Sequence, residues 1–100
     1  MKERTLQSKI KKELEARGWL CWVNHGSPFM PAGLPDMMGI HRVYGFAAIE
    51  VKVAKNKPTK NQVRWVEKIR SKGHRAGVAW SVQEAIDICE GPLPAAETSK

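Results

Sequence analysis

Gly45-Phe46-Ala47-Ala48-Ile49-Glu50-Val51-Lys52 is the stretch that decides the fold of this chain. From Phe46 to Val51 the residues are apolar on both faces except for Glu50, which is typical of a central strand covered by helices on both sides. An acidic residue near the end of such a strand needs a partner or a metal ion. The stretch therefore predicts a layered α/β architecture with a functional carboxylate at one end of its sheet.

The residues around this strand predict the element order α-β-β-β-α-β-α. A helix is expected over about residues 2–17, because apolar residues recur there at one-turn spacing: Leu6, Ile10 and Leu14. Strands are expected over residues 19–23, 36–42, 45–52 and 76–80. Two further helices begin at capping-box patterns, at Thr59 and at Ser81. We therefore predict an α/β fold with a mixed four-stranded sheet flanked by helices, in which the strand over 19–23 is buried.

The chain has 100 residues, enough for one domain with a single core. From Gly91 onward it is rich in Pro, Ala and Ser, so we expect a domain over residues 1–90 and a flexible tail over residues 91–100. No apolar run approaches the roughly 18–20 residues of a membrane span. Residues 1–7 lack the apolar segment of a secretory signal, so we expect a cytoplasmic protein without a membrane partner.

The cysteines and histidines do not predict a metal site. Cys21 and Cys89 are too few and too far apart for zinc, and we expect both to be reduced, buried thiols. His25 lies in a loop, where a solvated side chain is favoured over a role near phosphate. His41 and His74 have no partner at zinc-binding spacing. No small-molecule cofactor is indicated.

The formal net charge of +7 is unevenly distributed. Residues 52–75, the basic stretch, contain nine Lys or Arg and one Glu. Such an excess suits a surface that binds a phosphate backbone, although a solvated helix face is the alternative. The exposed cations that we expect to contact nucleic acid are Lys55, Lys57, Lys60 and Arg64. The four tryptophans are expected to be mostly core, and an exposed one would stack on an unpaired base.

Asp36, Glu50 and Lys52 are the residues expected to perform chemistry. Asp36 follows a turn constrained by Pro35, which places its carboxylate at a sheet edge. With a tight turn near residues 43–45, Asp36 and Glu50 lie roughly opposite each other and reach one divalent cation, which prefers hard oxygen ligands. Lys52 is two residues from Glu50 and shares its face of the sheet, and the Val51 carbonyl is expected to complete the metal shell. The alternative is an ordinary surface ion pair.

These residues resemble the motif series of the VRR-NUC domain, within the PD-(D/E)XK nuclease superfamily. The resemblance covers about residues 3–90, and its motifs are Gly33-Leu34-Pro35-Asp36, Glu50-Val51-Lys52, Thr59 with Gln62, the lead-in Trp22 to Gly26, and Val78. It implies a restriction-endonuclease-like core with Asp36 and Glu50 as Mg²⁺ or Mn²⁺ ligands. It also implies that Lys52 positions the attacking water and that Gln62 is an active-site residue.

The pattern departs from the family at the first helix, where an acidic residue usually lies three positions before a glutamine and Arg4 lies here instead. Glu3 is within about 20° of the centre of the apolar helical stripe, and Glu13 is about 60° from it. Glu3 is therefore the candidate for the missing acid, with Glu13 as the runner-up.

The resemblance implies a metal-dependent, structure-selective DNA endonuclease. Standalone members of this size are typical of phages and prophages, which makes branched DNA such as Holliday junctions the expected substrate and a bacterial host cell the expected setting. One small domain covers little DNA, so a homodimer is expected. The alternatives are a non-catalytic nucleic-acid-binding module on the same fold, and a nuclease for flapped DNA or RNA.

Overall fold

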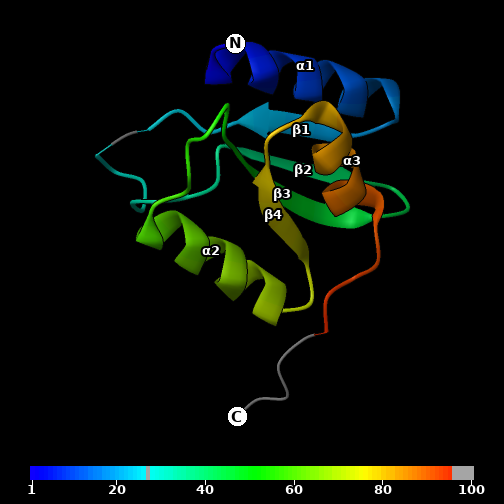
Figure 1. Ribbon diagram of the computed structural model, residues 1–100. Helices are drawn as coiled ribbons and strands as arrows, with labels where there is room; N and C mark the ends of the chain where they lie inside the picture. Colours follow the sequence, from blue (N-terminus) through cyan, green and yellow to red (C-terminus); the bar gives the residue numbers. More distant parts are fainter. Residues whose placement is uncertain (27, 96–100) are drawn as a thin grey trace.

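The computed structural model describes residues 1–26 and 28–95, and its elements follow the predicted order (Figure 1). They are α1 (Glu3–Ala16), β1 (Leu20–Val23), β2 (Met37–His41), β3 (Gly45–Val51), α2 (Lys60–Ser71), β4 (Arg75–Ala79) and α3 (Val82–Glu90). Residues 91–95 form neither helix nor strand, while the predicted tail beyond them, residues 96–100, lies outside the described residues. None of the described helices is long and apolar enough to cross a membrane.

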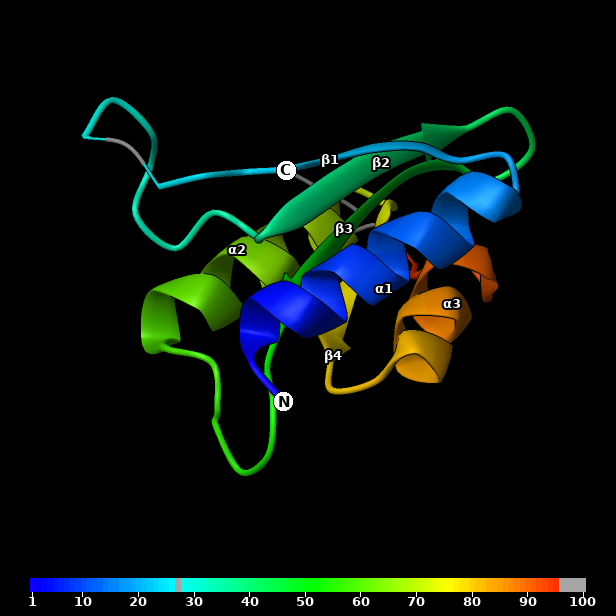
Figure 2. The same cartoon turned by 90° about the horizontal axis from the view of Figure 1, so that it is seen from above.

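The four strands form one mixed sheet in the order β1-β2-β3-β4. β2 is antiparallel to β1 and β3, whereas β4 runs parallel to β3 after the α2 crossover. α1 and α3 pack against each other and the sheet, and α2 packs on β3 and β4 from the other side (Figures 1 and 2). The predicted fold class is therefore confirmed.

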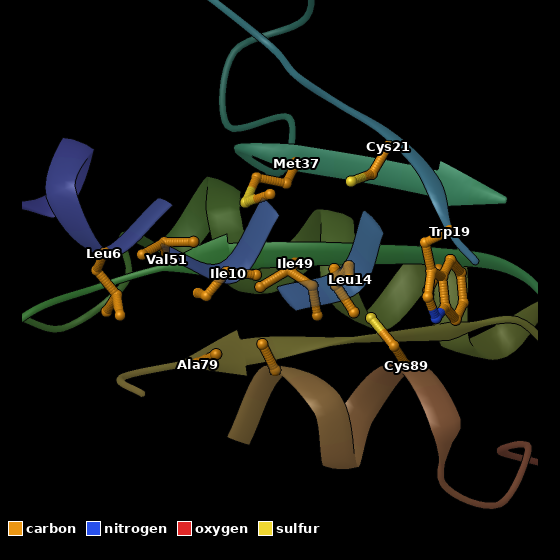
Figure 3. Close-up of a cluster of buried hydrophobic side chains, with 12 residues drawn as sticks. Leu6, Ile10, Leu14, Trp19, Cys21, Met37, Ile49, Val51, Ala79 and Cys89 are labelled. Atoms are coloured by element: carbon orange, nitrogen blue, oxygen red, sulfur yellow. The ribbon is translucent and has the colours of Figure 1, made fainter. Parts of the chain in front are cut away.

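Alternation along β3 divides the core between the two faces of the sheet. Ala47, Ile49 and Val51 pack against the α1 and α3 side, together with Leu6, Ile10 and Leu14 (Figure 3). Ala48 packs with Val66 of α2 on the other side. Because side chains alternate along a strand, Glu50 lies on the α2 side, in line with Ala48.

β1 corrects the prediction of a buried strand. Cys21 is buried, but Leu20 is 64% exposed and Trp22 is 40% exposed. The reason is that α2 packs on β3 and β4, so the part of the α2-side face of the sheet that β1 forms is left open. The expectation of mostly buried tryptophans is likewise wrong for Trp22 and Trp80, while Trp19 is in the core. Both cysteines are free and buried, as predicted.

The β2–β3 hairpin is held by His41 at the end of the sheet that lies away from Asp36. Nδ1 of His41 accepts hydrogen bonds from the backbone N–H groups of Val43 (2.9 Å) and Tyr44 (3.3 Å). Nε2 is therefore the protonated nitrogen, and it donates to the carbonyl of Arg17 at 2.9 Å. These contacts give His41 a structural role, consistent with the absence of zinc-ligand spacing.

Candidate active site

The loop before Asp36 is held against the first turn of α2. Gly33 has φ +82°, and a Cβ atom at this position would lie 2.6 Å from the Cβ atom of Asn61. One residue earlier, the Ala32 carbonyl accepts a hydrogen bond from Trp65 Nε1 at 3.1 Å. A glycine is required here for both its conformation and its close contact, which explains its place in the Gly-Leu-Pro-Asp motif.

Asn24, at the end of β1, holds the same loop from the opposite side. Its side-chain amide donates to the Pro35 carbonyl at 2.7 Å, and its main-chain N–H donates to the Asp36 carbonyl at 2.6 Å. Asn24 therefore fixes the backbone on which the Asp36 carboxylate is mounted. Asn24 lies in the lead-in motif from Trp22 to Gly26, but nothing in that motif predicts this role.

Asp36 and Glu50 form the carboxylate pair at the centre of the site. The register pairs Met37 with Ile49, so one residue further Asp36 lies opposite Glu50. Oδ2 of Asp36 accepts a hydrogen bond from the Val51 N–H at 2.9 Å. Glu50 is only 1% exposed, and its Oε1 atom has no hydrogen-bond partner within the described part of the chain.

Lys52 supplies the cation nearest to this pair. Its Nζ atom lies 3.6 Å from Oε2 of Glu50, and the lysine side chain is largely buried. The two side chains share one face because they are two residues apart on an extended strand. The structure thus brings Asp36, Glu50 and Lys52 together. The structure also places the Val51 N–H in this group, as a donor to Asp36. A role for the Val51 carbonyl as a metal ligand stays a prediction.

The environment of Glu50 favours its protonated form. Burial, and then the charge of Asp36 and a hydrogen bond with it, raise the pKa of Glu50 to about 8, and Lys52 only partly opposes this shift. At neutral pH the buried carboxyl therefore retains a proton. A cation bound between the two carboxylates would take the place of that proton and satisfy the unpaired Oε1 atom.

The donor atoms of the carboxylate pair fit a hard divalent cation. Mg²⁺ typically takes one or two carboxylates and keeps several waters, and Mn²⁺ has similar preferences for oxygen ligands. Within residues 1–26 and 28–95 there is no group of three or more His, Cys, Asp or Glu placed to hold a metal ion. The site therefore offers two carboxylates and leaves the remaining positions to backbone, water or phosphate oxygens.

The structure separates the two candidates for the acid on α1. Glu3 is half-buried in the first turn, at the end of α1 where Leu6 approaches Val51 (Figure 3). Glu13 lies toward the other end and forms an ion pair with Arg17 at 2.9 Å. Neither residue joins the carboxylate pair in a three-residue cluster, so the role of Glu3 stays a prediction that rests on its position.

The side chain of Gln62 has a structural role at the start of α2. Its Oε1 atom accepts a hydrogen bond from the Thr59 N–H at 2.8 Å, and its own N–H donates to Thr59 Oγ1 at 3.2 Å. This completes the predicted capping box at the start of α2. No described contact joins Gln62 to Asp36 or Glu50, so the active-site role implied by the family resemblance stays untested.

The four cations expected to bind nucleic acid are all exposed: Lys55, Lys57, Lys60 and Arg64. Arg75, counted in the basic stretch, is not on the surface, because its guanidinium donates to the Tyr44 and Gly91 carbonyls and is buried.

Beside Asp36 the surface has a pocket of about 430 Å³, lined by loop residues that include Asn24, His25 and Gly33.

Comparison with known proteins defines the class first. This chain shares the α/β fold of Archaeoglobus fulgidus Hjc, a Holliday junction resolvase, on which it superposes with a TM-score of 0.61. That match has 23% sequence identity and covers 78% of this chain and 67% of the resolvase. Within this class, the chain matches a solved VRR-NUC domain with a TM-score of 0.73 and 27% identity, over 89% of this chain and 95% of the other. No family model and no curated protein matches the sequence.

Proposed function

We propose that this protein is a divalent-metal-dependent DNA endonuclease that hydrolyses phosphodiester bonds in branched DNA, with four-way junctions as the preferred substrate. The observation that supports this most is the buried carboxylate pair, in which Glu50 Oε1 has no protein partner among the described residues and Lys52 is the adjacent cation. The fold shared with a VRR-NUC domain and a junction resolvase supports the same reaction class.

Each residue of the site has a distinct task in this proposal. Asp36 and Glu50 hold the cation, with the Asp36 carboxylate oriented by the Val51 N–H. When bound, Mg²⁺ or Mn²⁺ neutralises charge at the scissile phosphate and lowers the pKa of a coordinated water. Lys52 orients the attacking water and stabilises the negative charge that builds up on the phosphate. The exposed Lys55, Lys57, Lys60 and Arg64 bind the DNA backbone on the α2 side of the site.

The test is cleavage of labelled four-way junction, duplex, flap and RNA substrates of matched length, in Mg²⁺, Mn²⁺ and EDTA. We expect the junction to be cut in Mg²⁺ or Mn²⁺ and to remain intact in EDTA. Asp36→Ala should abolish cutting while the fold and most of the DNA affinity remain, and Lys52→Ala should slow it about 100-fold or more. Preferential cutting of RNA or flaps would instead identify the substrate as one of those.

A non-catalytic nucleic-acid-binding module is the second candidate. It is favoured by one observation, the absence of a third acidic residue near the carboxylate pair within the described chain. The same assay separates the two functions, because DNA binding without cleavage in either metal would leave only the binding module.

We also propose that the protein acts as a homodimer, in which two sites face two DNA strands. Sedimentation with and without junction DNA measures the oligomeric state.

A further inference from the structure

The connection between β1 and β2 carries an exposed apolar segment, Pro28-Phe29-Met30-Pro31, which we call the apolar tip. All four residues are exposed, and Phe29 is 94% exposed. Both views of the molecule show this connection extending beyond the end of the sheet (Figures 1 and 2). A run of consecutive exposed apolar residues is unfavourable on a free surface and is typical of a binding site.

The apolar tip is mounted on a loop that is held at both ends. Asn24, which precedes the tip, donates hydrogen bonds to the carbonyls of Pro35 and Asp36, which follow it. On the other side of the loop, the Ala32 carbonyl accepts a hydrogen bond from Trp65 Nε1 at 3.1 Å. These contacts fix the base of the loop and leave the side chains of the tip outside the fold.

The apolar tip borders the candidate active site. Pro28, Met30 and Pro31 line the same pocket of about 430 Å³ that Asp36 lines. Phe29 lies between these residues in the chain, and its side chain is almost entirely accessible. A substrate that occupies this pocket to reach Asp36 therefore also meets the apolar tip.

The base of the same loop contacts the turn of α2 that carries two cations. Asn61, against which Gly33 packs, accepts a hydrogen bond from the guanidinium of Arg64 at 3.2 Å. Lys60 precedes Asn61 in the chain, and both cations are exposed. Residues 26–35 contain no charged side chain. An uncharged apolar projection next to cations suits nucleic acid, with phosphates at the cations and bases at the tip.

We propose that the apolar tip inserts at a break in base stacking, such as the branch point of a DNA junction, where Phe29 and Met30 contact the exposed bases. Apolar side chains enter DNA between neighbouring bases, which must first be unstacked. An intact duplex resists this step, whereas at a branch point the stack is already interrupted. The tip thus determines specificity for branched DNA.

This inference deepens the proposed function and rests on it for the nature of the substrate. Insertion of the apolar tip is nevertheless a separate property, because it requires no metal and no cleavage. It can therefore be measured as binding alone.

Binding is measured by fluorescence anisotropy in EDTA, with a labelled four-way junction, a duplex with a two-nucleotide bulge and an intact duplex. The tip variant is Phe29→Ala/Met30→Ala. Its control is Val43→Ala/Leu93→Ala, which also removes two exposed apolar side chains, neither of which lines the pocket beside Asp36. We expect the tip variant to lose about fivefold or more in affinity for the junction and the bulged duplex, and less than twofold for the intact duplex. The control should change each affinity less than twofold.

Lys60→Ala/Arg64→Ala separates phosphate contacts from base contacts. It should weaken binding of all three DNAs alike and lower the slope of log affinity against log salt by about 1.8, whereas the tip variant should leave this slope unchanged because it removes no charge. Equal losses of the tip variant on all three DNAs, no loss on any, or no DNA binding by the unmodified protein would overturn the inference. Binding to anionic phospholipid vesicles that the tip variant loses, with DNA affinity unchanged, would identify a membrane surface as the occupant instead.

The outcomes distinguish this inference from the proposed function. If the tip variant loses affinity for the junction and the bulged duplex but no substrate is cleaved in Mg²⁺ or Mn²⁺, the role of the apolar tip remains and the endonuclease proposal fails. If junctions are cleaved and the tip variant binds them as well as its control does, the endonuclease remains and the inference about the tip fails.

Discussion

Val51 donates its main-chain N–H to Oδ2 of Asp36 at 2.9 Å, so the strand that contains Glu50 also orients the neighbouring carboxylate. The two acids therefore have different surroundings although they are close together. Asp36 has a backbone donor, whereas Glu50 is almost completely buried and one of its oxygens has no partner in the described chain. This asymmetry makes Glu50 the residue whose charge most needs a cation.

Glu50→Gln should therefore have opposite effects on activity and on stability. It removes a proposed metal ligand, so we expect cleavage to be lost. It also removes a buried acid whose pKa is raised from 4.5 to about 8. Between these values the folded state holds a proton that the unfolded state releases, so the stability of the metal-free protein falls as pH rises. Glu50→Gln should abolish most of this fall and gain about 1–3 kcal/mol at pH 8.

Thermal unfolding in EDTA at pH 5 and pH 8 measures the effect. Addition of Mg²⁺ at pH 8 should then raise the Tm of the unmodified protein and leave that of Glu50→Gln nearly unchanged, because a ligand stabilises only the state that binds it. An equal pH dependence of both proteins would mean that Glu50 is not the group that titrates.

Gly33→Ala tests whether the loop before Asp36 must pack on α2. The substitution places a methyl group 2.6 Å from Asn61 Cβ at a residue with φ +82°, so either the loop or the helix must move. We expect a loss of about 1–3 kcal/mol in the free energy of unfolding and a clear fall in cleavage. Gly26→Ala is the matched control, because a Cβ atom there meets nothing within 4 Å. Similar behaviour of the two variants in urea unfolding and in cleavage would contradict this.

The geometry of the carboxylate pair could be predicted from the sequence because it follows from local rules. A short turn after His41 fixes the hairpin register, and the register then places Asp36 opposite Glu50. Alternation along β3 places Lys52 beside Glu50. Both relationships depend on neighbours in the chain or on one adjacent strand.

Other features depended on tertiary contacts that have no local pattern. Asn24 holds the Asp36 loop partly through a main-chain N–H, which any residue except proline would offer. Trp22 is exposed because of where α2 lies, which its own strand does not determine. In the sequence, Arg75 looks like part of a basic surface. In the structure its side chain is buried, and it donates hydrogen bonds to the carbonyls of Tyr44 in the hairpin and of Gly91.

Gln62→Glu separates a structural role of Gln62 from a role in the active site. Glutamate completes a capping box as well as glutamine does, so we expect the stability of Gln62→Glu to change by less than about 0.5 kcal/mol. A new negative charge near the substrate phosphate should reduce cleavage about tenfold or more. Gln62→Ala is the control for the cap and should destabilise the protein. If Gln62→Glu cleaves at the normal rate, Gln62 serves only the helix cap.

Glu3→Gln and Glu13→Gln decide which acid of α1 acts at the site. Glu3 is at the end of α1 where Leu6 approaches Val51, and we keep the prediction that it acts at the metal site. We expect Glu3→Gln to reduce cleavage at least tenfold, about 1.4 kcal/mol of transition-state stabilisation. Glu13 is paired with Arg17 on the surface, so Glu13→Gln should leave cleavage unchanged and cost less than about 1 kcal/mol in stability. The two variants remove the same charge from the same helix, so unequal cleavage rates would reflect position alone. Damage by Glu13→Gln with normal activity of Glu3→Gln would contradict the assignment.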